Sequence, residues 1–420
     1  MKKLEVKGGR KISGTIKISG SKNATLPILA STILTDKKII IKNIPIVKDV
    51  ETMAELLRTI GSAIKLDQKN KKIEIFNKRS LKTFAPYHLL KTMRAGVLVL
   101  GPLLAKYRTA KVALPGGCAI GTRPIDLHLN GLKKMGASIK INDGYVIASA
   151  KKGLKGCLIK FPKISVGATE NLLIAACFAQ GETKLRNCAL EPEIDDLINF
   201  LKKLGCKIKR IGKRSINVFG KEKLKSVTHE VIFDRIEAGT YIIAAALTKG
   251  KLKIKKINPK IIKTEINLLQ KMGVKILKKK NQIIVSRPKK LKSISVVTKP
   301  YPGFPTDLQA QWMALMTIAR GGSKIKENIY KDRFSHVSEL MRFGAEIRMD
   351  DNVAYVEGDS ILKSAPVMST DIRASASLIL AALSAKGESS ISRIYHIDRG
   401  YEKIENKIKS LGGDIERFSS

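Results

Sequence analysis

A unit of about 70 residues recurs six times along this chain and sets the strongest limit on its fold. In each copy a helix-like stretch ends in a bulky apolar residue and a glycine, and a strand-like run follows. The glycines are Gly61, Gly136, Gly205, Gly273, Gly344 and Gly412, at intervals of 75, 69, 68, 71 and 68 residues. Because six copies span nearly all of the 420 residues, residues that depart from the repeat are the candidates for function.

Each copy also begins with an alanine-rich apolar segment, a turn and a β-prone run. In the first copy the pattern predicts a helix over 23–34, a strand over 38–44 and a second helix over 47–60. A hairpin over 64–66 and 72–76 completes the unit. The helices are apolar almost all round, which predicts that sheets cover them. One unit could hardly bury such helices alone, so we predict an α/β fold in which several units share a core.

The bulk composition is that of a globular protein, with 44% hydrophobic and 27% charged residues. A length of 420 residues predicts two or three domains. The longest apolar run, 95–105, is too short to cross a membrane, and the N-terminus lacks the pattern of a signal peptide. Five scattered cysteines favour a reducing compartment without disulfides or a zinc site, so we expect a cytoplasmic protein.

The net charge of +43 raises the question of nucleic-acid binding. The excess lysines are spread along the chain without forming one block, and only 5% of residues are aromatic, which leaves few platforms for stacking bases. We therefore expect neither a nucleic-acid nor a membrane partner. The charge is interpreted as the solvated surface of an enzyme whose field helps to recruit a small anionic substrate.

A glycine-rich loop, LPGGCAIGTRPIDLH over 114–128, interrupts the second copy. Its glycines let the backbone approach a ligand closely. Cys118 lies among them rather than in an apolar helix, and Arg123 could bind an anion or favour the thiolate form of Cys118. Cys118 is therefore a candidate nucleophile or proton donor, although an incidental turn cysteine would look the same. The other four cysteines fit small buried hydrophobic residues.

Cationic residues also occupy the predicted starts of apolar helices, beside small residues. They are Lys22, Arg94, Arg373 and Arg399. A helix N-terminus already favours anions, so a cation there is unfavourable unless it serves a phosphate or carboxylate. Together with Arg123, these residues predict a convergent anion site. The fifth copy has Asp307 in this position, which either caps its helix or stays ionised among the cations and serves as a base.

These segments together resemble the UDP-N-acetylglucosamine 1-carboxyvinyltransferases, a family of enolpyruvyl transferases in the EPSP synthase superfamily, over essentially the whole chain. The most specific segments are SGSKNATLPIL, KTMRA, LPGGCAIGTRPIDLHL, SVGATEN, DRIEAGTY, YPGFPTDLQAQ, DIRASASL and HIDRGYEKIE. The resemblance implies a two-domain inside-out α/β barrel with three repeats per domain, buried helices and outer sheets. It implies one domain over 22–231 and another over 1–21 plus 232–420, with the active site in the cleft between them.

The resemblance implies transfer of the enolpyruvyl group of phosphoenolpyruvate to the 3′-hydroxyl of UDP-N-acetylglucosamine, with release of phosphate. This is the first committed step of peptidoglycan precursor synthesis and serves cell-wall biogenesis, cell shape and cell division. The implied partners are the two small-molecule substrates, and activity requires no oligomer. No metal or organic cofactor is expected, and the sequence contains no cluster with metal-ligand spacing.

The resemblance also assigns individual residues. Cys118 is the implied proton donor, forms a covalent adduct with phosphoenolpyruvate and is the thiol alkylated by fosfomycin, while Asp307 is the implied base for the sugar hydroxyl. The residues implied to bind phosphoenolpyruvate are Lys22, Asn23, Arg123 and Arg399, of which Lys22 and Arg399 are also implied to be catalytic. The residues implied to bind the sugar nucleotide are Arg94, Arg123, Pro124, Ile125, Asp126, Leu127, Lys163, Ile164, Ser165, Val166, Asp307 and Ile329. Asp371 and Arg373 are implied to support the site, and His128 and His396 are interpreted as structural.

Two alternatives stay open at this point. The sister enzyme, 3-phosphoshikimate 1-carboxyvinyltransferase, shares the barrel and many of the cations but lacks the loop cysteine. A non-catalytic basic binding protein on the same fold is expected to have lost at least one of these polar residues, and none is lost here.

Overall fold

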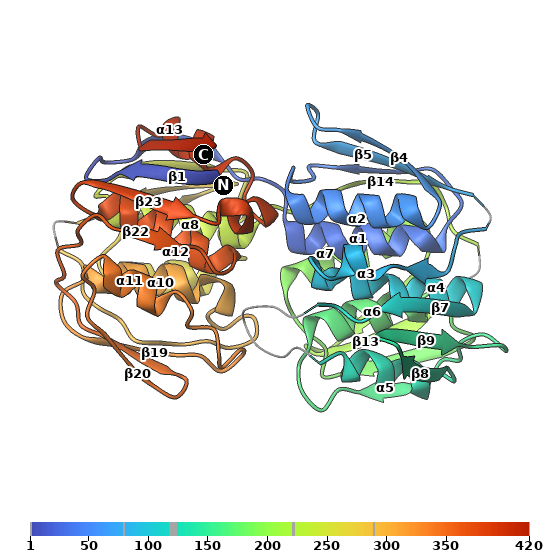
Figure 1. Ribbon diagram of the computed structural model, residues 1–420. Helices are drawn as coiled ribbons and strands as arrows, with labels where there is room; N and C mark the ends of the chain where they lie inside the picture. The colour runs from blue at the N-terminus through green and yellow to red at the C-terminus, as the bar shows by residue number, and fades with distance from the viewer. Residues whose placement is uncertain (1, 79, 117–123, 221–222, 289, 420) are drawn as a thin grey trace. The chain divides into compact units, whose positions relative to one another are not determined.

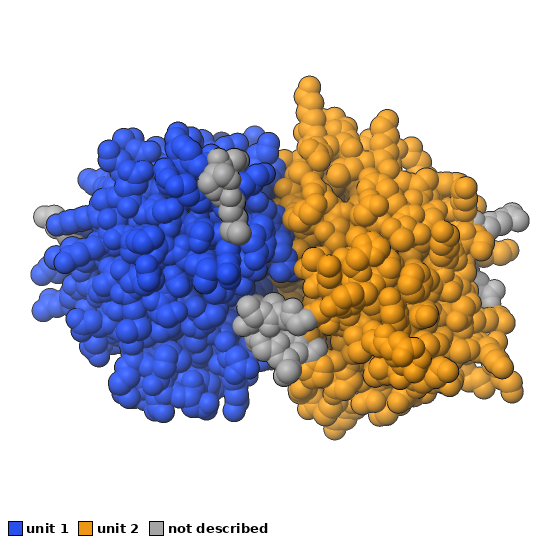
Figure 2. All heavy atoms as spheres, viewed as in Figure 1, with its two compact units in different colours: residues 1–19, 118–121, 233–420 blue, residues 20–117, 122–232 orange. Residues whose placement is uncertain are grey.

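The computed structural model describes residues 2–78, 80–116, 124–220, 223–288 and 290–419. These residues form two compact units, which Figure 2 shows in different colours. Unit 1 holds the described residues of 1–19 and 233–420, and unit 2 holds those of 20–117 and 122–232. No helix in the described part of the chain is long and apolar enough to span a membrane.

Unit 2 contains three four-stranded sheets, in the orders β14-β3-β5-β4, β6-β7-β9-β8 and β10-β11-β13-β12. Its strands are β3 (Ile39–Lys42), β4 (Ser62–Asp67), β5 (Lys72–Asn77), β6 (Phe84–Ala85), β7 (Thr109–Ala113), β8 (Ser138–Asn142), β9 (Tyr145–Ser149), β10 (Leu158–Lys160), β11 (Glu182–Arg186), β12 (Lys207–Ile211), β13 (Ser215–Phe219) and β14 (Val227–Glu230). Its helices are α1 (Lys22–Ser31), η1 (Thr32–Leu34), α2 (Lys48–Thr59), α3 (Tyr87–Leu90), η2 (Arg94–Val99), α4 (Leu100–Tyr107), α5 (Asp126–Lys134), α6 (Val166–Ala176) and α7 (Pro192–Leu204).

Unit 1 also contains three four-stranded sheets, in the orders β22-β23-β1-β24, β16-β17-β15-β2 and β18-β19-β21-β20. Its strands are β1 (Lys2–Lys7), β2 (Ser13–Lys17), β15 (Lys251–Lys255), β16 (Lys275–Lys279), β17 (Gln282–Ser286), β18 (Val296–Val297), β19 (Ser323–Lys326), β20 (Ile347–Asp350), β21 (Val353–Val356), β22 (Pro366–Met368), β23 (Glu388–Ser392) and β24 (Asp414–Ser419). Its helices are α8 (Arg235–Leu247), α9 (Lys263–Lys271), η3 (Thr306–Leu308), α10 (Gln309–Thr317), α11 (Val337–Arg342), α12 (Ile372–Ser384), η4 (Ile394–Arg399) and α13 (Ile404–Lys409).

All six sheets share one pairing pattern, as six copies of one unit require. Each begins with a parallel pair, such as β10 with β11, and continues with two antiparallel pairs, such as β11 with β13 and β13 with β12. Strands from distant parts of the sequence complete three of the sheets: β14 joins β3, β2 joins β15, and β1 lies between β23 and β24. The N-terminal strands therefore belong to the unit that is otherwise built from the C-terminal half of the chain.

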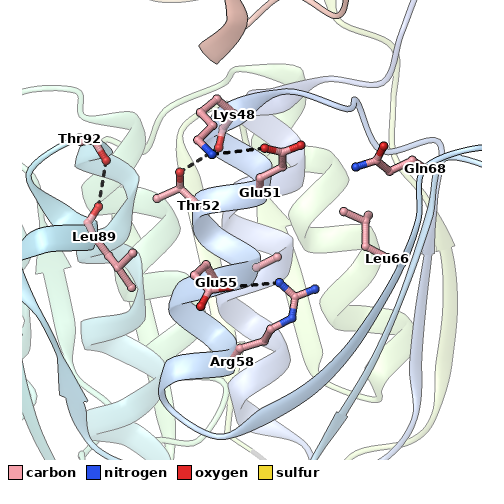
Figure 3. Close-up of a pocket in the computed structure, with 10 residues that line it drawn as sticks. Lys48, Glu51, Thr52, Glu55, Arg58, Leu66, Gln68, Leu89 and Thr92 are labelled. Carbon is pink, nitrogen blue, oxygen red and sulfur yellow. Dashed lines mark hydrogen bonds and ion pairs between the residues drawn. The ribbon is translucent and has the colours of Figure 1, made fainter. Parts of the chain in front are cut away.

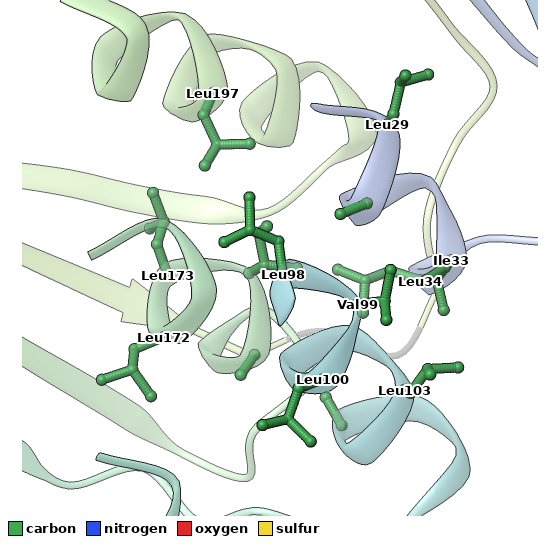
Figure 4. Packing of buried hydrophobic residues seen from close by; sticks show 14 of the residues in the cluster. Leu29, Ile33, Leu34, Leu98, Val99, Leu100, Leu103, Leu172, Leu173 and Leu197 are labelled. Atoms are coloured by element: carbon green, nitrogen blue, oxygen red, sulfur yellow. The ribbon is translucent and has the colours of Figure 1, made fainter. Parts of the chain in front are cut away.

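The first helix of each repeat is buried. Every residue of α8 and α10 is buried, and so is every residue of α1 except Asn23. Within unit 1, α10 and α12 lie between strands β1 and β23 on one side and β19 and β20 on the other (Figure 1). In unit 2, leucines of α1, α4, α6 and α7 meet in one core (Figure 4). This arrangement matches the predicted buried helices and outer sheets.

The second helix of each repeat differs from the prediction that the helices are apolar almost all round and covered by sheets. In α2, Met53, Leu56 and Leu57 are buried, whereas Glu55 and Arg58 are exposed. These helices contact the core along one stripe and solvent along the other, which is the usual reason for amphipathic spacing.

The repeated glycines end helices, as predicted. All six have positive φ, between 86° for Gly412 and 111° for Gly61. Gly205, for example, is the left-handed C-cap of α7, with its N–H donating to the carbonyls of Leu201 and Lys202. A side chain is strained in this conformation, which explains why glycine recurs at the position.

Candidate active site

Lys22 is the first residue of α1 and is held by a buried ion pair. Ser21 caps the helix, its hydroxyl accepting the N–H of Ala24 at 3.3 Å. Lys22 Nζ lies 2.9 Å from Asp49 Oδ2, and the two side chains are only 10% and 6% exposed. Asn23 follows and is half-buried. The ammonium group is thus fixed at a helix start, as predicted. Its partner Asp49 could not be recognised from the sequence, because an acid in the first turn of α2 is also favourable for that helix itself.

Arg94 begins η2 and contacts the end of the glycine-rich loop. Its Nη2 donates to the carbonyl oxygen of Pro124 at 3.3 Å, which brings together two predicted sugar-nucleotide residues from separate segments. Asp126, the first residue of α5, is exposed, whereas Ile125 and Leu127 are buried. Any contact from the latter two to a polar ligand would therefore use the backbone.

His128 is buried behind this segment and is neutral. Burial, followed by the charge of Arg94, lowers the pKa of His128 to about 4. Its Nδ1 lies 2.9 Å from the amide nitrogen of Asn171, which can donate to the neutral ring. The side-chain oxygen of Asn171, Oδ1, accepts the N–H of Gly101 at 2.8 Å. His128 and Asn171 thus link α4, α5 and α6. The structural interpretation of His128 agrees with this geometry.

The predicted segment 163–166 lies at the start of α6. Ser165 caps the helix, its hydroxyl accepting the N–H of Ala168 at 3.3 Å. Lys163 is exposed, and Ile164 and Val166 are half-buried. A cation beside the N–H groups of a helix start can bind an anion such as a phosphate group.

Asp307 lies in η3 and pairs with two buried arginines of unit 1. Its Oδ1 is 2.9 Å from Arg333 Nη1 and its Oδ2 is 3.1 Å from Arg373 Nη2. The carboxylate remains 25% exposed, whereas each arginine side chain is 6% exposed. Two guanidinium groups favour the ionised carboxylate, which can then accept a hydrogen bond from a hydroxyl group. Arg333 lies between elements and outside the helix-start pattern, so the sequence gives no sign of its role.

Arg373 is positioned by its own helix and by a buried polar network. Asp371 caps α12, accepting the N–H groups of Arg373 at 2.7 Å and Ala374 at 3.2 Å, which gives Asp371 a structural role. Arg373 Nη1 lies 3.4 Å from the Tyr401 hydroxyl, which is 2.8 Å from Thr240 Oγ1. Burial lowers the pKa of Arg373, but the charges of Asp307, Tyr401 and Asp234 and the hydrogen bond to Asp307 together outweigh it, so the net shift is upward. Arg373 is therefore a permanent cation.

Glu327 fastens together the two segments that carry Asp307 and Ile329. It is 0% exposed. Its Oε1 accepts the hydroxyl of Thr298 at 2.6 Å and the N–H groups of Ile329 at 2.8 Å and Tyr330 at 3.1 Å. Its Oε2 accepts the hydroxyl of Thr306, the residue before Asp307, at 2.9 Å. The sequence offered no signal for Glu327, because an isolated glutamate after a strand is usually solvated.

The structure corrects the prediction for Arg399. This residue is the last of η4 and not the start of a helix, because α13 begins only at Ile404. Its charge lies near His396, whose pKa is lowered first by burial and then by Arg399. Arg399 is half-buried at the end of a short turn, so the helix-start argument does not apply to it.

Cys118 and Arg123 lie outside the described residues. The other four cysteines are free thiols: Cys177, Cys188 and Cys206 are buried, and Cys157 is half-buried. Burial raises the pKa of Cys188 to about 11, which makes it a poor nucleophile at neutral pH. Within the described ranges, no group of three or more His, Cys, Asp or Glu side chains could hold a metal ion.

A pocket of about 440 Å³ lies elsewhere in unit 2, over the exposed side of α2. Figure 3 shows its lining, in which Lys48 contacts Glu51 and Arg58 contacts Glu55 along one helix face. These are exposed pairs of opposite charge at i,i+3 spacing, and such pairs are common on solvated helices. None of the predicted site residues lines this pocket, so we do not assign it to the candidate active site.

Comparison with known proteins gives a consistent picture. The profile of the EPSP synthase (3-phosphoshikimate 1-carboxyvinyltransferase) family matches residues 6–408. The UDP-N-acetylglucosamine 1-carboxyvinyltransferase of Pelagibacter ubique is 59% identical over 419 residues, covering 100% of both chains. The protein of the same name from Geotalea daltonii is 51% identical over 417 residues, covering 99% of both.

Two solved structures bear on the fold alone. The enolpyruvyl transferase NikO from Streptomyces tendae has a TM-score of 0.90 at 24% identity and covers 100% of this chain and 99% of its own. An EPSP synthase from Acinetobacter baumannii has a TM-score of 0.76 at 18% identity, with both chains fully covered. They confirm the predicted fold class.

Proposed function

The chain belongs to the EPSP synthase family and, within it, to the UDP-N-acetylglucosamine 1-carboxyvinyltransferases, and from this membership we propose that it transfers the enolpyruvyl group of phosphoenolpyruvate to the 3′-hydroxyl of UDP-N-acetylglucosamine, releasing phosphate. The observation that carries the proposal is the 59% identity over the full length of a relative of that name. Two ion pairs also support the proposal, because Asp49 holds Lys22 and Arg333 holds Asp307 in a fixed geometry.

Phosphoenolpyruvate carries a phosphate and a carboxylate, so its binding requires several fixed cations. We assign this role to Lys22, Arg123 and Arg399, with Asn23 as a hydrogen-bonding neighbour. Pairing with Asp49 leaves Lys22 only part of its charge for the ligand, but holds the ammonium group in one position. A cation that is already placed loses little entropy when the anion binds.

The acceptor hydroxyl requires a group that orients it and takes its proton. We assign this role to Asp307, within a sugar-nucleotide site formed by Arg94, residues 124–127, residues 163–166 and Ile329. The two arginines on Asp307 keep it ionised but also weaken it as a base. Its contribution should therefore come mainly from orientation of the hydroxyl and from acceptance of the proton late in the reaction.

We assign the protonation of the methylene carbon, and the covalent adduct, to Cys118. A thiol can act as this acid only if it retains its proton near the working pH. Fosfomycin should then alkylate Cys118, and Cys118→Ser should abolish the increase in mass. Persistence of the labelled mass in Cys118→Ser would refute the assignment.

The cellular role follows from the same proposal. We place the protein in the cytoplasm, at the first committed step of peptidoglycan precursor synthesis, with consequences for cell shape and division. We further propose that the two units are the two domains of an enolpyruvyl transferase. Neither a metal nor an organic cofactor enters this reaction scheme.

The decisive experiment measures phosphate release from phosphoenolpyruvate with each candidate acceptor. Release should depend strictly on UDP-N-acetylglucosamine and be lost in Asp307→Asn. Release driven by shikimate 3-phosphate instead would identify the sister enzyme, and an absence of turnover with both acceptors would favour the non-catalytic binding protein.

A further inference from the structure

The outer face of the sheet β16-β17-β15-β2 in unit 1 is an array of lysines. In β15, Lys251, Lys253 and Lys255 alternate with Leu252 and Ile254, which are fully buried. The neighbouring strands continue the outward rows, because Lys255 pairs with Lys17 of β2 and the outward residues of β16 alternate with buried Ile276. We call this outward set the lysine face; its cations are Lys17, Lys251, Lys253, Lys255, Lys275 and Lys279.

No acid offsets the lysine face within its own sheet. The four strands read SGTIK, KLKIK, QIIVS and KILKK and contain neither aspartate nor glutamate. Some outward strand lysines elsewhere in the described chain do have acidic partners, such as Lys72 with Glu74 and Lys184 with Glu182. The described residues include no ion-pair partner for any of the six cations of the lysine face. Their charges therefore repel one another and are free to meet an external anion.

The spacing of strands and residues in the sheet makes this array dense. Adjacent strands are about 4.8 Å apart and alternate residues of a strand about 6.8 Å apart, so six ammonium groups share a patch of roughly 15 Å on each side. On the edge strand β16, between Lys275 and Lys279, Leu277 is 55% exposed and pairs with half-buried Ile284. The lysine face thus combines a broad positive charge with one exposed apolar contact.

This chemistry fits an anionic lipid surface better than a nucleic acid. Lysines are point charges that match spread negative charge, and clusters of about four to eight basic residues are typical of proteins that dock on anionic lipids. Protein surfaces that bind nucleic acids usually also contain arginines and aromatic side chains that stack on bases. Strands β2, β15, β16 and β17 contain neither. The exposed leucine would meet the headgroup boundary.

We propose that the lysine face docks this protein on membranes rich in anionic phospholipids, as a peripheral contact that does not involve the substrate site. The proposal departs from the expectation, based on the spread of lysines along the sequence, that there is no membrane partner. It is independent of the proposed function, because none of the six lysines belongs to the residues assigned to substrate binding. Pairing of β2 with β15 places Lys17 beside Lys255, although the two residues are far apart in the sequence. The spread of lysines along the sequence does not reveal this proximity.

The test is co-sedimentation of the full-length protein with vesicles of one part phosphatidylglycerol to two parts phosphatidylcholine, with pure phosphatidylcholine as reference. The protein should bind only the anionic vesicles at about 0.1 M salt and be released at about 1 M, where the Debye length falls from about 10 to about 3 Å. A triple variant, Lys251→Gln with Lys253→Gln and Lys255→Gln, should partition roughly 100-fold more weakly, at about fivefold for each lysine.

The matched control changes the same number of charges on a different surface of unit 1. Lys324→Gln, Lys326→Gln and Lys363→Gln together should retain binding within about threefold of the unmodified protein. Equal losses in the two triple variants would overturn the proposal, since net charge alone would then explain binding. No binding of the unmodified protein to anionic vesicles would also overturn it, as would tighter, face-dependent binding to a single-stranded oligonucleotide. Unchanged enzyme turnover and tryptophan fluorescence would verify that the variants are folded.

Discussion

The contacts of Glu327 give a sharp prediction about how unit 1 holds its part of the site. In Glu327→Gln, the three hydrogen bonds at Oε1 lose their charge assistance. Bonds to a charged group contribute about 1.5–3 kcal/mol and neutral ones about 0.5–1.5 kcal/mol, so the loss is about 1 kcal/mol for each bond. The Thr306 hydroxyl can rotate and accept a hydrogen bond from the new amide group, so the change at Oε2 adds little to the loss of stability. We therefore expect the free energy of unfolding of unit 1 to fall by about 3 kcal/mol.

Urea titration monitored by tryptophan fluorescence can measure this loss. Trp312 is the single tryptophan, is fully buried in α10 and lies edge-on to Phe304 at 5.1 Å, so it reports on unit 1. With a slope near 3 kcal/mol per molar urea, the midpoint should fall by about 1 M. Glu416→Gln is the matched control: its side chain is 56% exposed and pairs with Lys409, so it should cost under about 1 kcal/mol.

The same variant tests the position of the sugar-nucleotide segments. Because Glu327 fastens the backbone of Ile329 and the residue before Asp307, Glu327→Gln should raise the KM for UDP-N-acetylglucosamine about tenfold, or about 1.4 kcal/mol. The KM for phosphoenolpyruvate should change much less. If Glu327→Gln and Glu416→Gln had the same urea midpoint and the same KM values, the bracing role of Glu327 would be wrong.

Buried ionisable side chains give three more tests. Asp49→Ala should lower the free energy of unfolding of unit 2 by about 3 kcal/mol, because it leaves the Lys22 ammonium group buried without this carboxylate. Thermal unfolding followed by circular dichroism measures the loss. A loss under about 1 kcal/mol would contradict the prediction. Burial lowers the pKa of His336 from 6.5 to about 4. Between these pH values the unfolded state therefore binds a proton that the folded state does not. The stability contributed by neutral His336 is complete above pH 6.5 and is lost as the pH falls toward 4. His336→Gln should flatten the pH dependence of the urea midpoint of unit 1 in this window, and an unchanged slope would be evidence against it. Arg373→Lys should lower kcat by about tenfold or more with a smaller change in KM, because lysine cannot contact both Asp307 and Tyr401 as the guanidinium group does. Steady-state kinetics measures both constants. A tenfold change in KM with kcat unchanged would contradict a role of Arg373 in the reaction step.

The sequence by itself determined the repeated architecture of this protein. Apolar periodicity and the positive φ that favours glycine are local properties, so six copies of one pattern predicted buried helices covered by sheets and the six glycine stops. The same local reasoning placed Lys22 and Arg373 at helix starts. It was wrong for Arg399, because an arginine beside a glycine looks alike at the end of a short turn and at the start of a helix.

Tertiary structure alone decided which charges meet. Asp49 pairs with Lys22, Arg333 joins Arg373 on Asp307, and Glu327 links the segments that carry Thr306 and Ile329. Lys17 joins the lysine face only because β2 pairs with β15 across more than half of the chain. Each of these contacts depends on strand register and on the placement of helices from different repeats. Such contacts are set by the core of each unit, in which several repeats pack together, and no single repeat specifies them.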